Sequence, residues 1–156
     1  MSLETKITLQ GHNTVLAIIR DMSKRADDPS GLMARLSILG FQDVMSHFSK
    51  QEGATKSGDQ PTAWKALSPI TIERRRQGSK SGSNKILQDT GVLRNSILPG
   101  TRGSRKAVVS TNIIYAGTHQ YGRGNIPRRP YMWLSRIAID KMLAQTLSWV
   151  RRGRLL

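Results

Sequence analysis

The sequence predicts a small α+β domain in which amphipathic helices pack on a small antiparallel sheet, with long basic loops and a long C-terminal helix. Apolar residues recur at helical spacing in two successive N-terminal segments and again near the C-terminus. Short alternating segments typical of strands lie at the N-terminus and in the second half of the chain. The length of 156 residues suits a single domain, 1–156, and the sequence has no internal repeat.

The N-terminal third of the chain predicts a strand followed by two helices. Residues 3–10 alternate between polar and apolar and indicate the strand. Residues 14–26 indicate an amphipathic helix, and after the turn DDPSG a second helix runs over 31–50. Two successive half-apolar helices must pack on each other or on a sheet. The polar segment 52–62 then predicts a loop.

Short elements joined by basic loops are expected next. Residues 68–76 predict a short helix ending in three arginines, because a Ser-Pro pair at its start suits a cap and a first helical position. Residues 77–85 are rich in Gly, Ser and Lys and predict a flexible basic loop. Residues 87–97 indicate a capped short helix leading into a strand, and 106–112 indicate a second strand.

The segment YAGTHQYGRGNIPRRPYMW, residues 115–133, combines glycine, arginine, proline and aromatic residues. Residues 115–121 predict a short helix that Gly122 closes, and Gly124 permits the tight loop that follows. The segment lacks the Lys-Ser/Thr ending of a phosphate-binding loop. We therefore interpret it as a structural hinge.

The end of this segment leads into the C-terminal helix. Pro127 and Pro130 favour an extended path, and Pro130 is placed to start a long helix over 131–152. Tyr131 and Trp133 are bulky and amphipathic, which suits either the core or an anchor for a neighbouring subunit.

Positive charge is concentrated in the second part of the chain. The net charge is +15, and residues 1–53 carry six basic and six acidic side chains, whereas 54–156 carry nineteen basic and four acidic ones. The basic part therefore faces a polyanion or an acidic protein surface, or it balances acidic neighbours in an assembly. Nucleic acid is the commonest partner of such a surface.

The residue types that carry catalysis are absent or isolated in this sequence. It therefore predicts a protein without enzymatic activity, cofactor or metal. The absence of cysteine excludes disulfides, thiolate catalysis and cysteine-bound zinc. His12, His47 and His119 have no metal-site spacing, and His47 lies on an apolar helix as a packing residue would. A nuclease built on His119 is the remaining catalytic alternative. No segment approaches a membrane span, so we expect no membrane partner.

Four short segments carry a family resemblance. They are WKALSPITIERRR (64–76), LQDTGVLRNSI (87–97), STNIIYAGTHQYG (110–122) and IPRRPYMWLS (126–135). In this order and approximate spacing they resemble the phage virion-morphogenesis family, the tail-completion and neck proteins of Mu-like and P2-like tailed phages. The family often has a small residue at the position of Arg128.

The resemblance implies a structural, non-enzymatic protein without a cofactor. It implies a homo-oligomeric ring at the head–tail junction, with sixfold symmetry expected because the tail is sixfold. The ring would act as a tail terminator, or as a stopper or adaptor in the neck, and would join the filled head to the tail. Its partners would be further copies of itself and the neighbouring connector and tail-tube proteins, with genomic DNA passing through the lumen. It would reside in the virion after assembly in the cytoplasm of the host bacterium.

The alternative function is non-specific nucleic-acid binding through the basic C-terminal two-thirds of the chain. For the structural role, we expect aromatic and arginine side chains of the four segments to form the interface with other subunits or partners. These residues are Trp64, Arg74, Arg75, Arg76, Tyr115, His119, Tyr121, Arg123, Arg128, Arg129, Tyr131 and Trp133. For Trp64, we prefer an anchor beneath a loop over a platform for base stacking.

Overall fold

The computed structural model describes residues 12–78 and 84–153 and has the expected α+β fold. Within these ranges it contains six helices and two antiparallel two-stranded sheets. The elements are α1 (His12–Asp27), α2 (Ser30–Lys50), β1 (Glu52–Gly53), β2 (Thr62–Ala63), α3 (Pro69–Gly78), α4 (Val92–Asn95), β3 (Leu98–Thr101), β4 (Ala107–Ser110), α5 (Ala116–Tyr121) and α6 (Arg136–Arg152).

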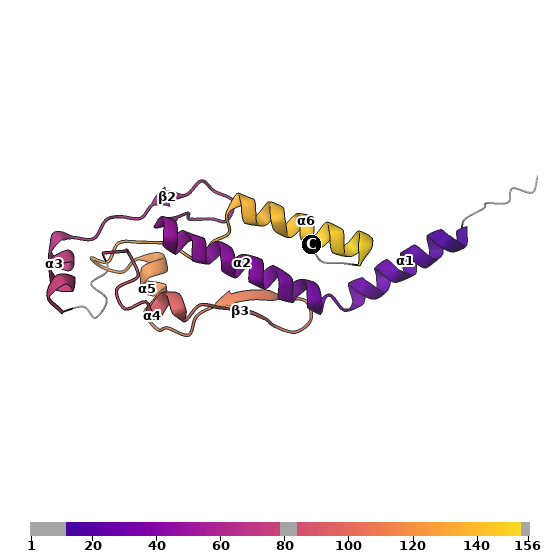
Figure 1. The fold of residues 1–156 in the computed structure, drawn as a ribbon, viewed down its shortest axis with the longest axis horizontal. Coiled ribbons are helices and arrows are strands. Elements are labelled where there is room, and N and C mark those ends of the chain that lie inside the picture. Colours follow the sequence, from indigo (N-terminus) through magenta and orange to yellow (C-terminus); the bar gives the residue numbers. More distant parts are fainter. Residues whose placement is uncertain (1–11, 79–83, 154–156) are drawn as a thin grey trace, which may run out of the picture.

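Helix α2 is the central element of an elongated molecule, with α6 along one side and the β3–β4 hairpin along the other (Figure 1). Gly40 of α2 lies where all three meet. A Cβ atom at this position would be 3.3 Å from Val109 Cγ2 of β4 and 3.4 Å from Met142 Cε of α6. The absence of a side chain at Gly40 therefore lets both layers approach α2 closely.

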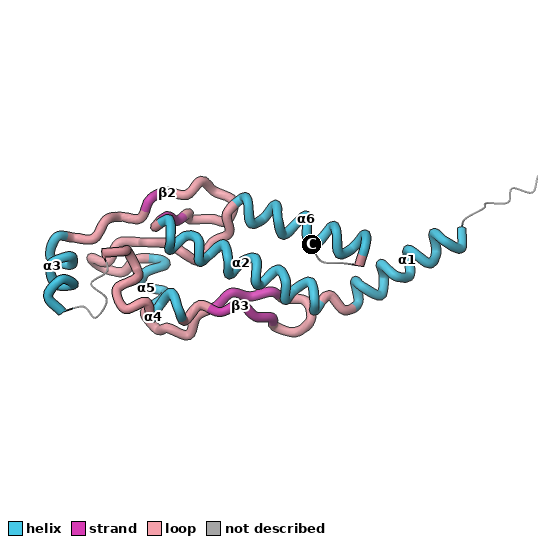
Figure 2. The backbone as a smooth tube through the Cα atoms, viewed as in Figure 1, coloured by secondary structure: helices cyan, strands magenta, loops and turns pink. Residues whose placement is uncertain are grey.

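The β1–β2 hairpin lies at the C-terminal end of α2, whereas the β3–β4 hairpin lies along the helix (Figure 2). Strands β3 and β4 pair in antiparallel register from Leu98↔Ser110 to Thr101↔Ala107, close to the strands expected from the sequence. Strands β1 and β2 pair Glu52↔Ala63 and occur where we expected only a polar loop. Two residues per strand are too few to show an alternating pattern, so the sequence carried no signal for this pair.

Helix α1 extends away from the rest of the molecule beyond the start of α2 (Figure 1). It contains the predicted helix 14–26. Its C-terminal part is attached through Arg25, whose Nη2 donates a hydrogen bond to the Val150 carbonyl in the last turn of α6 (3.1 Å). This guanidinium lies at the negative end of the α6 dipole, where a cation is favourable. The predicted strand 3–10 lies outside the described residues.

The C-terminal helix starts at Arg136, so the predicted start at residue 131 is wrong. Ser135 is the N-cap of this helix, a role for which Pro130 is too far upstream: the Ser135 Oγ accepts a hydrogen bond from the Ala138 amide (3.1 Å). The preceding backbone amides have distant side-chain acceptors. Those of Tyr131 and Met132 both donate to Oε1 of a single residue, Gln120 (3.0 Å each). Such bonds hold the segment extended, because these amides are satisfied without a helix.

Asp43 of α2 fixes the start of α6. Its carboxylate accepts hydrogen bonds from the Ser135 amide and the Ser135 hydroxyl, both at 2.7 Å, and lies 3.4 Å from Nε2 of His47. Burial would raise the pKa of Asp43, but the hydrogen bonds from His47 and Ser135 outweigh it and hold the pKa below its usual value. The imidazole of His47 is 1% exposed and stacks on Trp133 at 4.1 Å, so its predicted packing role is confirmed.

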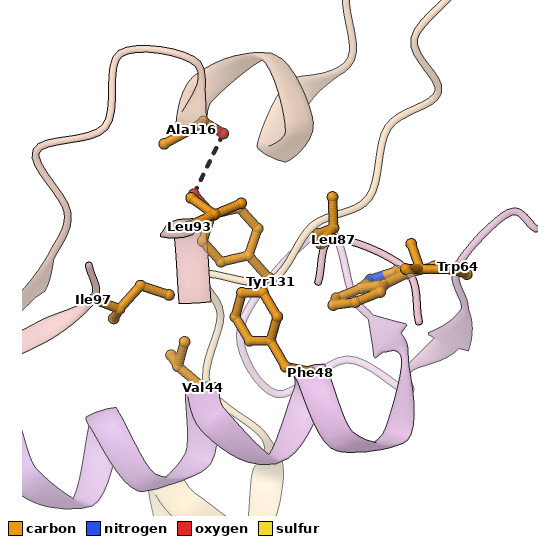
Figure 3. Close-up of a cluster of buried hydrophobic side chains, with 9 residues drawn as sticks. Val44, Phe48, Trp64, Leu87, Leu93, Ile97, Ala116 and Tyr131 are labelled. Atoms are coloured by element: carbon orange, nitrogen blue, oxygen red, sulfur yellow. Dashed lines mark hydrogen bonds between the residues drawn. The ribbon is translucent and has the colours of Figure 1, made fainter. Parts of the chain in front are cut away.

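An aromatic core occupies the end of α2 where the short helices α4 and α5 gather (Figure 3). Phe48 contacts Trp64 edge-on at 5.7 Å and Tyr131 at 5.3 Å between ring centroids. The Tyr131 hydroxyl donates to the Ala116 carbonyl (3.3 Å), and Trp64 Nε1 donates to the Pro130 carbonyl (2.8 Å). Burial raises the pKa of Tyr131 to about 12. Each buried polar atom named here therefore has a partner.

The remaining short elements agree with the sequence. Helix α3 starts at Pro69 and α4 precedes β3 as expected. Helix α5 is closed by Gly122, whose φ of 79° a residue with a side chain rarely adopts. The predicted flexible loop 77–85 is wrong at its start, because residues 77 and 78 belong to α3. Residues 79–83 of this loop lie outside the described part.

A basic pocket as the candidate partner site

An open pocket of about 680 Å³ lies among α3, α4 and α5 and collects part of the predicted interface. Its walls come from three separate stretches, residues 65–75, 87–93 and 115–129. Five of the predicted site residues line it: Arg74, Arg75, Tyr115, His119 and Arg129. We call this the basic pocket, because within the described part of the chain four cationic side chains and a single carboxylate, that of Asp89, line it.

Arg129 is the most buried cation of the basic pocket, with 7% of its surface exposed. Its Nε and Nη2 both donate to the Lys65 carbonyl, at 3.0 and 2.9 Å, and Nη2 also reaches the Ala66 carbonyl at 3.2 Å. Burial and the positive charge of Arg75 lower the pKa of Arg129. Among the described residues no carboxylate pairs with it, so carbonyl dipoles alone offset its charge.

Arg75 and Asp89 form the one ion pair on the pocket wall among the described residues. Arg75 Nε lies 3.6 Å from Asp89 Oδ1, and Arg75 Nη1 donates to the Lys85 carbonyl (3.0 Å). The pair links α3 to the segment before α4. Arg74 and Lys65 are both exposed and line the same pocket. The pocket therefore keeps a strongly positive character although Asp89 neutralises one charge.

His119 lies on α5 at the wall of the basic pocket. Its ring meets Tyr115 edge-on at 5.8 Å, and its Nδ1 is buried without a hydrogen-bond partner among the described residues. Burial and the charge of Arg129 lower the pKa of His119 below 6.5, so its imidazole is neutral at pH 7. Within residues 12–78 and 84–153, no group of three or more His, Asp or Glu side chains could hold a metal ion.

The lowered pKa of His119 makes folding stability pH-dependent. Between the folded pKa and 6.5, the unfolded chain binds the proton and the folded chain does not. The free energy of unfolding is therefore expected to decrease as pH falls through this window. His119→Asn removes this proton uptake, so the decrease between pH 7 and 5 should be shallower. Urea titrations at a series of pH values measure it, and identical pH profiles for parent and variant would contradict the assignment.

The other predicted interface residues divide into two groups. Trp64, Tyr131 and Trp133 are at most 6% exposed and pack the core of their own chain. This agrees with the second interpretation of these residues, a core position for Tyr131 and Trp133 and an anchor beneath a loop for Trp64. In this conformation they present no surface to a neighbour. The second group is exposed and lies off the pocket wall: Arg76, Tyr121, Arg123 and Arg128. For these exposed residues and for the pocket residues, the interface role stays a prediction.

Sequence reasoning missed two features of this site. Lys65 and Asp89 line the pocket, but neither stood out, because each is a single charge in a polar stretch. The apolar floor, with Leu67, Leu87 and Leu93, was also missed as a pocket surface, since these residues read as ordinary core positions. The clustering of arginines in 74–76 and 128–129 was the one signal available.

Comparison with known protein families gives a match. The model of the phage virion morphogenesis family matches residues 23–150, from the last turns of α1 almost to the end of α6. The matched range includes all of the basic pocket and all four segments on which the resemblance was based. No curated protein and no solved structure matches the chain. None of the helices in the described part is long and apolar enough to cross a membrane.

Proposed function

The chain belongs to the phage virion morphogenesis family, and from this membership we propose that it is a structural protein that forms a ring at the head–tail junction of the virion. A role in building the phage particle follows from the family. The ring, its position and its neighbours are the proposed part. The ring has sixfold symmetry to match the tail, contacts connector and tail-tube proteins, and lets the genome pass through its lumen.

The exposed apolar surface of α1 is the observation that supports self-assembly into a ring. Leu16, Ile18 and Ile19 are 45%, 51% and 55% exposed on a helix that projects from the molecule (Figure 1). With 16 residues, α1 is about 24 Å long at about 1.5 Å per residue. Leu16 and Ile19 share one face of the helix and Ile18 lies on its flank, and exposed apolar surface of this kind marks an interaction site. A neighbouring copy of the chain would cover it, and repetition of that head-to-tail contact closes a ring.

Placing two carboxylates on this surface tests the ring. The double variant Ile18→Asp/Ile19→Asp should shift the protein to smaller species, because association would bury two charges without partners. Light scattering coupled to size-exclusion chromatography measures the mass, and negative-stain electron micrographs of the parent should show rings. The matched control is Ile70→Asp/Ile114→Asp, which places the same charges on isoleucines that are 80% and 100% exposed outside α1.

The control variant should keep the parent's mass. A parent protein that stays monomeric at high concentration and binds neither tails nor connectors would sink the ring proposal. Equal dissociation of both double variants would remove α1 as the assembly surface. Retention of the parent's mass by the α1 variant would do the same.

A further inference from the structure

We propose that the basic pocket binds a carboxylate side chain carried by an apolar segment of a neighbouring virion protein. This inference deepens the proposed function, because it identifies the chemistry by which the ring would recognise a partner other than itself. It assigns a role to the residues of the pocket that the family membership leaves without one.

The charge of the pocket calls for an anion. Lys65, Arg74, Arg75 and Arg129 line it, and Asp89 is the one carboxylate of the described residues that opposes them. The guanidinium of Arg129 uses Nε and Nη2 on backbone carbonyls, so Nη1 is the nitrogen left for a ligand among the described contacts. A buried guanidinium without a carboxylate is costly, and an oxyanion placed beside it gains a charge-assisted hydrogen bond.

The apolar lining of the pocket favours a protein segment over DNA. Leu67, Leu87 and Leu93 line the recess, as do the more exposed Val92 and Ile126, at 47% and 42%. Phosphates of nucleic acid are contacted by cationic and polar groups, and those contacts need no apolar lining. A peptide with an acidic side chain flanked by apolar ones matches both the charge and the lining of the pocket.

The partner is a different protein rather than a second copy of this chain. The obvious candidate from the chain itself is α1, which carries exposed apolar residues. It holds three cations and two carboxylates, so its net charge of +1 does not complement the pocket. Residues 54–156 are strongly basic as well. Neither of these parts of the chain is acidic, so electrostatic complementarity favours an acidic surface on a different protein.

The experiment measures binding of two fluorescein-labelled short peptides to the full chain by fluorescence polarisation. One alternates Glu and Leu, and the other has Gln in place of each Glu. Only the Glu peptide should bind saturably. The pocket variant Lys65→Gln/Arg74→Gln should weaken this binding about tenfold, the equivalent of about 1.4 kcal/mol. Both residues are exposed, so the fold should tolerate the change.

The matched control is Arg102→Gln/Arg105→Gln in the exposed turn between β3 and β4, which removes the same charge away from the pocket. It should bind the Glu peptide within about twofold of the parent, because exposed charges beyond a Debye length of about 10 Å are screened. A second pocket variant, Val92→Asp, places a competing carboxylate at the pocket wall without removing a cation. It should also weaken binding.

Equal weakening in the Lys65→Gln/Arg74→Gln variant and the Arg102→Gln/Arg105→Gln control would overturn the proposal, because net charge alone would then explain it. Equal binding of the Glu and Gln peptides would overturn it too. Binding of duplex DNA that is lost in the pocket variant but not in the control would reassign the pocket to phosphate and favour the nucleic-acid alternative. Light scattering on the same samples separates the two proposals: the pocket variant should keep the parent's oligomeric mass.

Discussion

Tyr131→Ala is expected to lower the free energy of unfolding by about 3–5 kcal/mol. Tyr131 is 1% exposed and stands at the centre of the aromatic core, against Phe48 and beneath α5 (Figure 3). Its removal leaves a cavity the size of a ring and deprives the Ala116 carbonyl of its donor. Urea or guanidinium titrations followed by circular dichroism measure the loss. A variant that fails to fold at 25 °C would be the extreme of the same effect.

Two further variants separate the causes. Tyr131→Phe keeps the ring and removes only the hydroxyl, so it should cost about 1 kcal/mol. Tyr121→Ala is the matched control, because this tyrosine is 73% exposed and its truncation should change stability by no more than about 0.5 kcal/mol. Comparable losses for Tyr131→Ala and Tyr121→Ala would contradict the position of the core.

Gly53→Ala is expected to be destabilising by at least about 3 kcal/mol, the upper end of the overpacking range. A Cβ atom at Gly53 would lie 2.0 Å from the Pro130 carbonyl oxygen and 2.6 Å from Trp64 Nε1. Neither atom can yield alone, because the two are joined by a hydrogen bond of 2.8 Å. The backbone of β1 or of the segment before α6 must therefore move. A shift in the midpoint of thermal unfolding measures the effect.

Gly117→Ala is the control for this glycine. It lies within α5, and a Cβ atom there would meet nothing within 4 Å. Because alanine favours the helix, the substitution should leave stability unchanged or raise it by up to about 1 kcal/mol. An innocuous Gly53→Ala would show that β1 does not approach Trp64 and Pro130 as described.

Elements with dense local signals could be predicted from the sequence. The predicted helix 31–50 has apolar residues along most of its length, and the bounds of α2 agree with it to within one residue. The start of α6 could not be predicted, because the amides of Tyr131 and Met132 depend on Gln120, which lies on a different element. A hydrogen-bond acceptor on a distant residue leaves no pattern in the local sequence. Pro130 was therefore the stronger signal for the start of the helix, although it was the wrong one.

The candidate site was partly visible in the sequence. Its arginines could be identified by their clustering, but the sequence did not separate the exposed from the buried ones. Arg128 is exposed, whereas the adjacent Arg129 is only 7% exposed. The guanidinium of Arg129 is held inside because it donates to the Lys65 carbonyl of a separate segment. The aromatic residues show the reverse case. Trp64 and Tyr131 are of residue types that are common at interfaces, but they are buried in their own chain.

Helix α1 joins its own subunit near its C-terminal end, through Arg25 and the turn into α2, while its apolar side chains face outward. In the proposed ring, the free energy of covering those side chains is released on association and not on folding. Mass action then links the stability of each subunit to the number of copies present. Subunits made early would stay dispersed, and rings would accumulate only once synthesis had passed a threshold concentration. The projecting helix would thus delay ring assembly until enough subunits had been made.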